Sequence, residues 1–142
     1  MTKSKVDSII FNEYISEKQG EQLEEIEDLL GKLVTNYKLI IVSNCKDNKI
    51  EEFFLQNNLE KYFVDFEYNG RTGLAKGENI RLLIKRNNLK YPVYVGNTDG
   101  DRRVARLIGI PFIYAFDGEH KIIDYDEKIN KFSEMLEVNI LK

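Results

Sequence analysis

The chain of 142 residues contains few of the residues on which several classes of protein depend. It has one cysteine, one histidine, two prolines and no tryptophan. A single cysteine cannot form an intrachain disulfide, and one cysteine with one histidine cannot complete a Cys/His zinc site. These scarcities are typical of proteins from a reducing compartment, so we expect a cytoplasmic location.

Long apolar runs and a strong charge of one sign are also absent. No run approaches the roughly 20 residues that span a bilayer, and the N-terminal segment has no apolar stretch of the secretory kind. The net charge is −3, which gives no general attraction to nucleic acid or to an anionic membrane. We therefore expect neither as a partner, and the length predicts one domain over residues 1–142.

Apolar runs alternate with helical patterns along the chain. The runs of strand character are residues 6–11, 38–42, 62–66, 93–95 and 112–115. The segments with apolar residues at helical spacing are residues 21–34, 50–57, 77–87, 102–108 and 129–136. Strands that alternate with such helices predict βαβ units and a mainly parallel sheet that is buried on both faces. The expected fold class is α/β, with a three-layer Rossmann-like architecture.

Polar side chains follow one of the expected strands and precede one of the expected helices. Ser43 and Asn44 follow the run 38–42, where a hydroxyl and free backbone N–H groups can hold a phosphate oxygen. The same residue types also cap helices routinely. Lys76 lies just before a helix, where its charge can neutralise a phosphoryl group, although a solvated loop lysine is the more common case.

Asn97 and Asp101 lie on the loop after another expected strand, with Asp99 between them. Oxygen ligands clustered on a loop suit Mg²⁺, which takes one or two carboxylates together with waters and substrate oxygens. Asn and Asp also favour turns, which is the alternative explanation. Because the carboxyl ends of parallel strands meet at one edge, we expect Ser43, Lys76 and Asn97 to converge there.

The order and spacing of these clusters resemble motifs two, three and four of the haloacid dehalogenase (HAD) superfamily of hydrolases. Residues 95–111 nearly reproduce the pattern Val-Gly-Asp-Thr-x-x-Asp, followed by Ala-x-x-Ala-Gly-Ile-Pro, of its phosphoglycolate-phosphatase-like members. Residues 70–79, Gly-Arg-Thr-Gly-Leu-Ala-Lys-Gly-Glu-Asn, are similar to the same group. The resemblance covers roughly residues 29–135 and implies a HAD core fold, with no room for a full helical cap domain.

The resemblance implies Mg²⁺-dependent hydrolysis of phosphate monoesters through an aspartyl-phosphate. In such enzymes one aspartate attacks phosphorus, and a second aspartate two residues later acts as general acid and base. By this resemblance Ser43, Asn44 and Lys76 bind the phosphate, whereas Asn97 and Asp101 lie on the side of the metal. The expected partner is a small phosphorylated molecule. A homo-oligomer is a second expectation, because members without a cap often use a neighbour's surface.

Two departures from the family pattern predict weak or absent catalysis. The nucleophile motif Asp-x-Asp-x-Thr occurs nowhere in the chain. Counting back from Ser43 places it at residues 11–15, so that Asn12 stands at the nucleophile position and Tyr14 at that of the general acid. A neutral carboxamide is a poor nucleophile, and Asn97 lacks the negative charge that the usual aspartate offers a metal.

The N-terminal segment allows a second interpretation. Residues 5–18 also fit a helical stripe, and would then be the last cap helix of a longer phosphatase of which this chain is the back part. Sheet topology favours a strand at residues 6–11 instead. The nucleophile strand of the family is central, and its absence would leave two inner edges of the sheet unpaired.

Three functional hypotheses follow from these observations. The first is a HAD-like phosphatase scaffold that has lost its chemistry. The second is an active phosphohydrolase that uses another acid, for which Asp7, Glu13 and Asp99 are the nearby candidates. The third is an interaction protein on a Rossmann-like scaffold without a small-molecule ligand. A response-regulator receiver does not fit, because residues 40–43 offer no phospho-accepting aspartate.

Overall fold

Six parallel strands form one sheet within residues 5–142, the part of the chain that the computed structural model describes. The strands are β1 (Ser8–Phe11), β2 (Lys38–Ser43), β3 (Asp65–Tyr68), β4 (Pro92–Gly96), β5 (Phe112–Ala115) and β6 (Glu127–Ile129). Their order across the sheet is β3-β2-β1-β4-β5-β6, so the first strand of the chain is an inner strand. The prediction of an α/β fold with a parallel sheet is confirmed.

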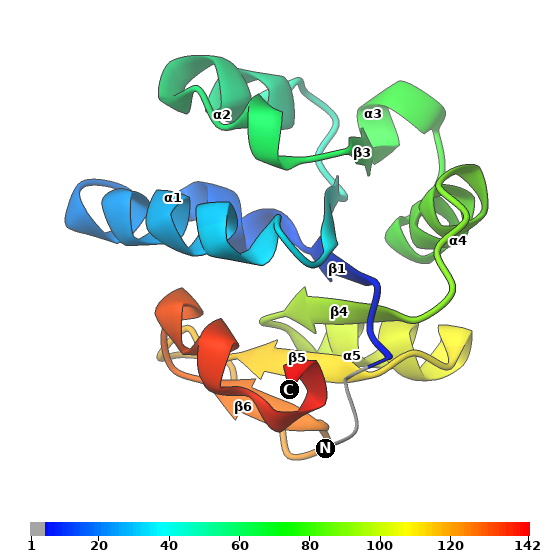
Figure 1. Ribbon diagram of the computed structural model, residues 1–142. Coiled ribbons are helices and arrows are strands. Elements are labelled where there is room, and N and C mark those ends of the chain that lie inside the picture. The colour runs from blue at the N-terminus through cyan, green and yellow to red at the C-terminus, as the bar shows by residue number, and fades with distance from the viewer. Residues whose placement is uncertain (1–4) are drawn as a thin grey trace.

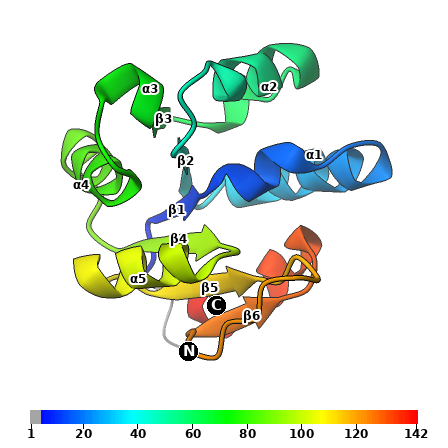
Figure 2. The same ribbon diagram turned by 180° about the vertical axis from the view of Figure 1, so that it is seen from behind.

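Helices cover both faces of this sheet (Figures 1 and 2). The α-helices are α1 (Glu21–Leu33), α2 (Lys49–Asn57), α3 (Asn69–Thr72), α4 (Lys76–Arg86) and α5 (Asp99–Ile108). The 3-10 helices are η1 (Glu13–Glu17), η2 (Glu60–Tyr62), η3 (Phe132–Glu137) and η4 (Asn139–Leu141). The helices α1 and α2 pack on one face with η3, whereas α4 and α5 pack on the other, which gives three layers.

The buried side chains explain why β1 is an inner strand. All four of its residues are without exposed surface. Ile9 and Phe11 belong to the apolar cluster under α1 and α2, whereas Ile10 belongs to the cluster under α4 and α5. A strand that buries both faces is stable only between layers of helices, with a hydrogen-bonded neighbour on each side.

The pairing of β1 decides between the two interpretations of the N-terminal segment. Residues 8–11 pair in parallel with residues 38–41 of β2 and residues 92–95 of β4. The strand predicted at residues 6–11 is therefore confirmed, and a helix over residues 5–18 is wrong. The apolar residues of that range are divided between β1, which is buried on both faces, and the short 3-10 helix η1, in which Ile15 is fully buried.

Two elements on either flank of the sheet differ from the predictions. The strand expected at residues 62–66 begins three residues later, at the start of β3, and the 3-10 helix η2 precedes it. The helix expected at residues 129–136 is wrong, because Ile129 pairs with Ala115 as the last residue of β6. Phe132 and Met135, both buried, lie three residues apart, a spacing that the 3-10 helix η3 satisfies.

The described residues contain no helix with the length and apolar character that a transmembrane span requires.

Candidate functional site

Three inner strands deliver polar side chains to the same edge of the sheet. Asn12 follows β1, Ser43 is the last residue of β2, and Asn97 follows β4. Because β1 pairs in parallel with both of the other strands, these residues share the carboxyl edge. In open parallel sheets this edge is the usual place of ligand binding. Lys76 reaches the edge from the first turn of α4.

The centre of the site is the carboxylate of Asp101, which is almost fully buried. Its Oδ1 atom accepts hydrogen bonds from the Tyr94 hydroxyl at 2.6 Å and the Lys76 ammonium at 3.1 Å. Its Oδ2 atom accepts from the Asn12 amide and the Thr98 hydroxyl, each at 2.8 Å. Two backbone N–H groups of the same loop also donate to Oδ2. Both oxygens are thus fully engaged by the protein.

Local sequence explains how Asp101 comes to be buried there. Thr98 caps α5, and its hydroxyl and the Asp101 carboxylate form a capping box across the first turn. The carboxylate then folds back over the end of β4. Gly96 makes room for it, because a Cβ atom at that position would lie 2.5 Å from the Asp101 Cβ.

The charges of this cluster are set by competing effects. Burial alone would raise the pKa of Asp101, but the Lys76 ammonium and the hydrogen bonds from Tyr94 and Thr98 outweigh it and hold that pKa below its ordinary value. Burial, together with the Asp101 carboxylate, raises the pKa of Tyr94 well above its ordinary value. Asp101 is therefore ionised, and Tyr94 stays a protonated donor, at neutral pH.

Asn12, at the expected nucleophile position, is held by hydrogen bonds at both ends of its amide. Its NH₂ group donates to Asn97 Oδ1 at 2.6 Å and to Asp101 Oδ2 at 2.8 Å. Its Oδ1 atom accepts the backbone N–H of Tyr14 at 3.2 Å and so caps η1. A flipped amide would set oxygen against oxygen on one side and N–H against N–H on the other, so only one orientation fits.

Lys76 lies between two carboxylates. Its ammonium is 3.1 Å from Asp101 Oδ1 and 3.0 Å from Glu13 Oε2, and only 9% of its side chain is exposed. Burial would lower the pKa of Lys76, but the charges of Asp101 and Glu13 outweigh burial and raise it. The charge that was expected to face a phosphoryl group is therefore already engaged within the protein.

The remaining predicted residues are not drawn into this cluster. Ser43 is buried at the same edge, but its hydroxyl accepts the backbone N–H of Cys45 at 3.0 Å. Asn44 is exposed on the loop after β2. The hydroxyl of Tyr14 accepts a hydrogen bond from the Lys18 ammonium at 2.8 Å, and its ring lies against Phe132.

Several residues of the site were not predicted. Tyr94 and Thr98 donate hydrogen bonds to Asp101. The pattern Thr-x-x-Asp is a helix-capping signal that could have indicated Thr98. The carboxylate of Asp117, which follows β5, accepts a hydrogen bond from the Asn97 amide at 2.9 Å and forms another with the imidazole of His120. These hydrogen bonds lower the pKa of Asp117 against the opposing effect of burial. The sequence signal that could have indicated Asp117 is an acidic residue shortly after an expected parallel strand.

Two of the three alternative acids lie away from the cluster. Asp7 is at the amino edge of the sheet, where its carboxylate accepts the backbone N–H groups of Lys90 and Tyr91. Asp99 is exposed on α5 and forms ion pairs with two arginines of the same helix. Glu13 alone touches the site, through Lys76.

The fold of the chain is similar to the folds of HAD-superfamily hydrolases of known structure. A HAD-like hydrolase from Streptococcus pneumoniae aligns with a TM-score of 0.71 and 20% identity, over 80% of this chain and 57% of that one. A subfamily IA HAD hydrolase from Geobacter sulfurreducens aligns with a TM-score of 0.71 and 13% identity, over 93% and 98%. Magnesium-bound YfnB from Bacillus subtilis, a putative HAD hydrolase, aligns with a TM-score of 0.67 and 21% identity, over 78% and 51%.

These likenesses show that the chain has the HAD fold, as the sequence motifs predicted. Phosphatases, including a predicted phosphoglycolate phosphatase, are among the similar structures. The chain spans only about half of YfnB and 57% of the streptococcal protein, but nearly all of the Geobacter protein. No family model matches the sequence, and neither does a curated protein.

The residues present do not fit the Mg²⁺ that the HAD resemblance implies. Within residues 5–142 no group of three or more His, Cys, Asp or Glu side chains is arranged to hold a metal ion. The side chain of Asn12 donates to the Asp101 carboxylate and that of Asn97 to the Asp117 carboxylate, and Lys76 already neutralises Asp101. The Asn12 NH₂ group donates to the same two oxygens that a cation would use. A divalent cation there would face N–H protons in place of oxygen ligands.

Proposed function

We propose that this chain is a HAD-type phosphohydrolase scaffold that has lost the covalent phosphatase reaction, so that it hydrolyses phosphate monoesters weakly or not at all. One observation carries the proposal. At the position that motif spacing assigns to the nucleophile, the Asn12 amide donates hydrogen bonds to Asp101 and Asn97. A carboxamide held in this way offers no negative oxygen to phosphorus and cannot form an acyl-phosphate.

The general-acid position and the metal side support the same proposal. Tyr14, two residues after Asn12, directs its hydroxyl to Lys18 and not toward the cluster. Asn97 brings no charge for Mg²⁺, and the Asp101 carboxylate is saturated by donors of the protein. The three losses act on one site, which is expected where selection for phosphate hydrolysis has ended.

Non-catalytic binding is a second candidate function, and one observation favours it. A cavity of about 690 Å³ opens at the carboxyl edge beside η1, α1 and α2. Ser43, Cys45 and Lys49 line one part of it, and Glu13 and Glu17 another. A volume of this size suits a small polar molecule.

The test is a phosphatase assay with p-nitrophenyl phosphate and phosphoglycolate in the presence of Mg²⁺. We expect no turnover by the wild type and partial recovery in the triple variant Asn12→Asp/Tyr14→Asp/Asn97→Asp. The matched control is the double variant Tyr14→Asp/Asn97→Asp, which lacks the nucleophile and should stay inactive. Mg²⁺ should raise the melting temperature of the triple variant but not that of the wild type, because only the variant offers adjacent carboxylates.

One result would overturn the proposal. Robust turnover by the wild type that is lost in Asp101→Asn but unchanged by substitution at Asn12 would point to a different nucleophile.

A further inference from the structure

Glu13 supplies a second negative charge to a lysine that already has a buried counter-ion. Asp101 is 1% exposed and pairs with Lys76 at 3.1 Å. One ammonium and one carboxylate balance, so the fold needs no second anion at this point. Glu13 nevertheless places Oε1 and Oε2 at 3.1 Å and 3.0 Å from the same Nζ atom.

Glu13 lies at the surface of the molecule and not in its core. It is the first residue of η1, directly after Asn12, and 36% of its side chain is exposed. Its Oε2 atom is nevertheless buried, and makes no hydrogen bond among the described residues, so that atom is held against Lys76 by charge. Glu13 thus pairs with the nearly buried Lys76 ammonium from a partly exposed position.

Acidic side chains outnumber basic ones around this carboxylate. Glu13, Glu17, Asp117 and Glu119 line a cavity of about 400 Å³ on the Asn97 side of η1, together with His120, which pairs with Asp117. Burial, together with the Glu13 charge, raises the pKa of Glu17. Lys76, Asp101 and Glu13 together carry a formal charge of −1, so an incoming oxyanion meets repulsion where a single Lys76 would attract it.

We infer that Glu13 is a tethered carboxylate that occupies the place of an anionic ligand on Lys76 and makes the site select against phosphate and related oxyanions. The inference rests on the proposed function, since it takes Lys76 as the former phosphate-facing charge. Because Glu13 lies on a short surface helix, its removal opens Lys76 without disturbing the Asp101 pair. The charge, and not only the shape, of residue 13 then determines which ligands enter.

The inference is tested by titrating inorganic phosphate into the wild type and variants by calorimetry at low salt. The wild type should show no saturable binding up to the highest phosphate concentration used. Glu13→Gln and Glu13→Ala should bind with a dissociation constant at least about tenfold below that concentration, as removal of a juxtaposed like charge permits. Glu13→Gln removes the charge and keeps the size of the side chain, whereas Glu13→Ala removes both, so the pair separates the effect of charge from that of space. Circular dichroism melts establish that each variant is folded.

Two controls make the test specific. Glu17→Gln removes a carboxylate from the same short helix that has no ion pair with Lys76, and should leave phosphate binding at the wild-type level. The double variant Glu13→Gln/Lys76→Met should lose what Glu13→Gln gains. Tight phosphate binding by the wild type, an equal gain in Glu17→Gln, or no gain in either folded Glu13 variant would overturn the inference.

The titration measures binding without turnover and therefore separates the two proposals. A triple variant that stays inactive would count against Asn12 as the nucleophile position. It would leave the phosphate titration, and with it the role of Glu13, unaffected.

Discussion

The Asn12 amide nitrogen lies between two oxygen acceptors at 2.6 Å and 2.8 Å, much as a small cation would. An oxygen in its place would be repelled by both acceptors unless a cation lay between them. Asparagine thus makes the polar edge stable without a metal, through hydrogen bonds alone. Under the proposal that Asn12 stands at the nucleophile position, the same residue that removes the nucleophile also supplies hydrogen bonds to the oxygens that a metal ion would otherwise bridge.

Lys76 provides the clearest prediction at this scale. Lys76→Met leaves the buried Asp101 carboxylate without its cation, and loss of one partner of a buried pair costs about 3–5 kcal/mol of unfolding free energy at neutral pH. Lys49→Met, at an exposed position, is the control and should change stability by less than about 0.5 kcal/mol. Urea unfolding at neutral pH measures both.

Acidification should reduce the deficit of Lys76→Met. In the wild type the Asp101 pKa is lowered below 3.8, so its contribution to stability is present above that value and is lost only as the pH falls through the lowered pKa. Without Lys76, burial raises that pKa, and the folded state gains stability as the pH falls through the raised value. A deficit that is the same at about pH 7 and about pH 5 would show that Asp101 does not depend on Lys76 for its charge.

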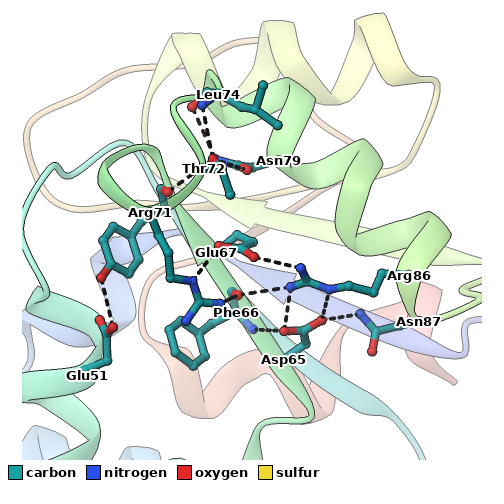
Figure 3. Close-up of polar contacts among 11 residues, drawn as sticks. Glu51, Asp65, Phe66, Glu67, Arg71, Thr72, Leu74, Asn79, Arg86 and Asn87 are labelled. Carbon is teal, nitrogen blue, oxygen red and sulfur yellow. Dashed lines mark hydrogen bonds and ion pairs between the residues drawn. The ribbon is translucent and has the colours of Figure 1, made fainter.

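At the scale of single elements, an ion-pair network attaches the edge strand β3 to α4 (Figure 3). Arg86 donates to both oxygens of Asp65 and to Glu67, each at 2.8 Å. Arg71 donates to the other oxygen of Glu67 at 2.9 Å. Burial would raise the pKa values of Asp65 and Glu67. Hydrogen bonds from Arg86 and Asn87 outweigh burial at Asp65, and those from Arg71 and Arg86 outweigh it at Glu67, so that both pKa values are lowered. Charged side chains at an edge strand also discourage pairing with another chain.

The network predicts that Arg86→Met destabilises the fold by roughly 1–3 kcal/mol, because buried Glu67 then keeps only Arg71. Arg103→Met is the matched control. That arginine is 74% exposed in its ion pair, and its loss should cost less than about 0.5 kcal/mol. Hydrogen exchange should show the amides of β3 losing protection first in Arg86→Met. Equal effects of the two substitutions would mean that the network does not stabilise β3.

The same strand shows why some elements could be predicted and others could not. β2 and β4 are continuous apolar runs, buried on both faces, and such runs are readable from the sequence. β3 reads Asp-Phe-Glu-Tyr, with charged side chains that need arginines from elsewhere in the chain. β6 has three residues and depends on pairing with β5. These elements are defined by tertiary partners, which local periodicity does not contain.

The candidate site divides in a similar way. Asn12, Lys76, Asn97 and Asp101 were picked out by motif spacing, and hydrogen bonds and ion pairs connect them in the structure. Their roles stay predictions. Tyr94 could not have been found, because a tyrosine within an apolar strand reads as core. The engagement of Lys76 by Glu13 depends on how η1 folds over the edge, which spacing alone does not indicate.

For the whole molecule, the sheet order makes the first strand the link between two halves. β2 and β3 lie on one side of β1, and β4, β5 and β6 lie on the other. Within the sheet each half reaches the other through β1, with four residue pairs in register on each side. We therefore expect the described residues to unfold as one cooperative unit, in line with the single domain predicted from length.

Deletion of residues 1–11 tests this arrangement. Loss of β1 removes the fully buried side chains of Ile9, Ile10 and Phe11 and leaves the inner edges of β2 and β4 unpaired. We expect a chain that aggregates or shows no cooperative thermal transition. Deletion of residues 141 and 142 is the control. It removes the hydrogen bond from the Tyr37 hydroxyl to the Leu141 carbonyl and the partly buried Leu141 side chain, and should lower stability by only about 1–3 kcal/mol while leaving a cooperative transition. A soluble chain without residues 1–11 that still melts cooperatively would show that the two halves hold together without the strand that carries Asn12 to the site.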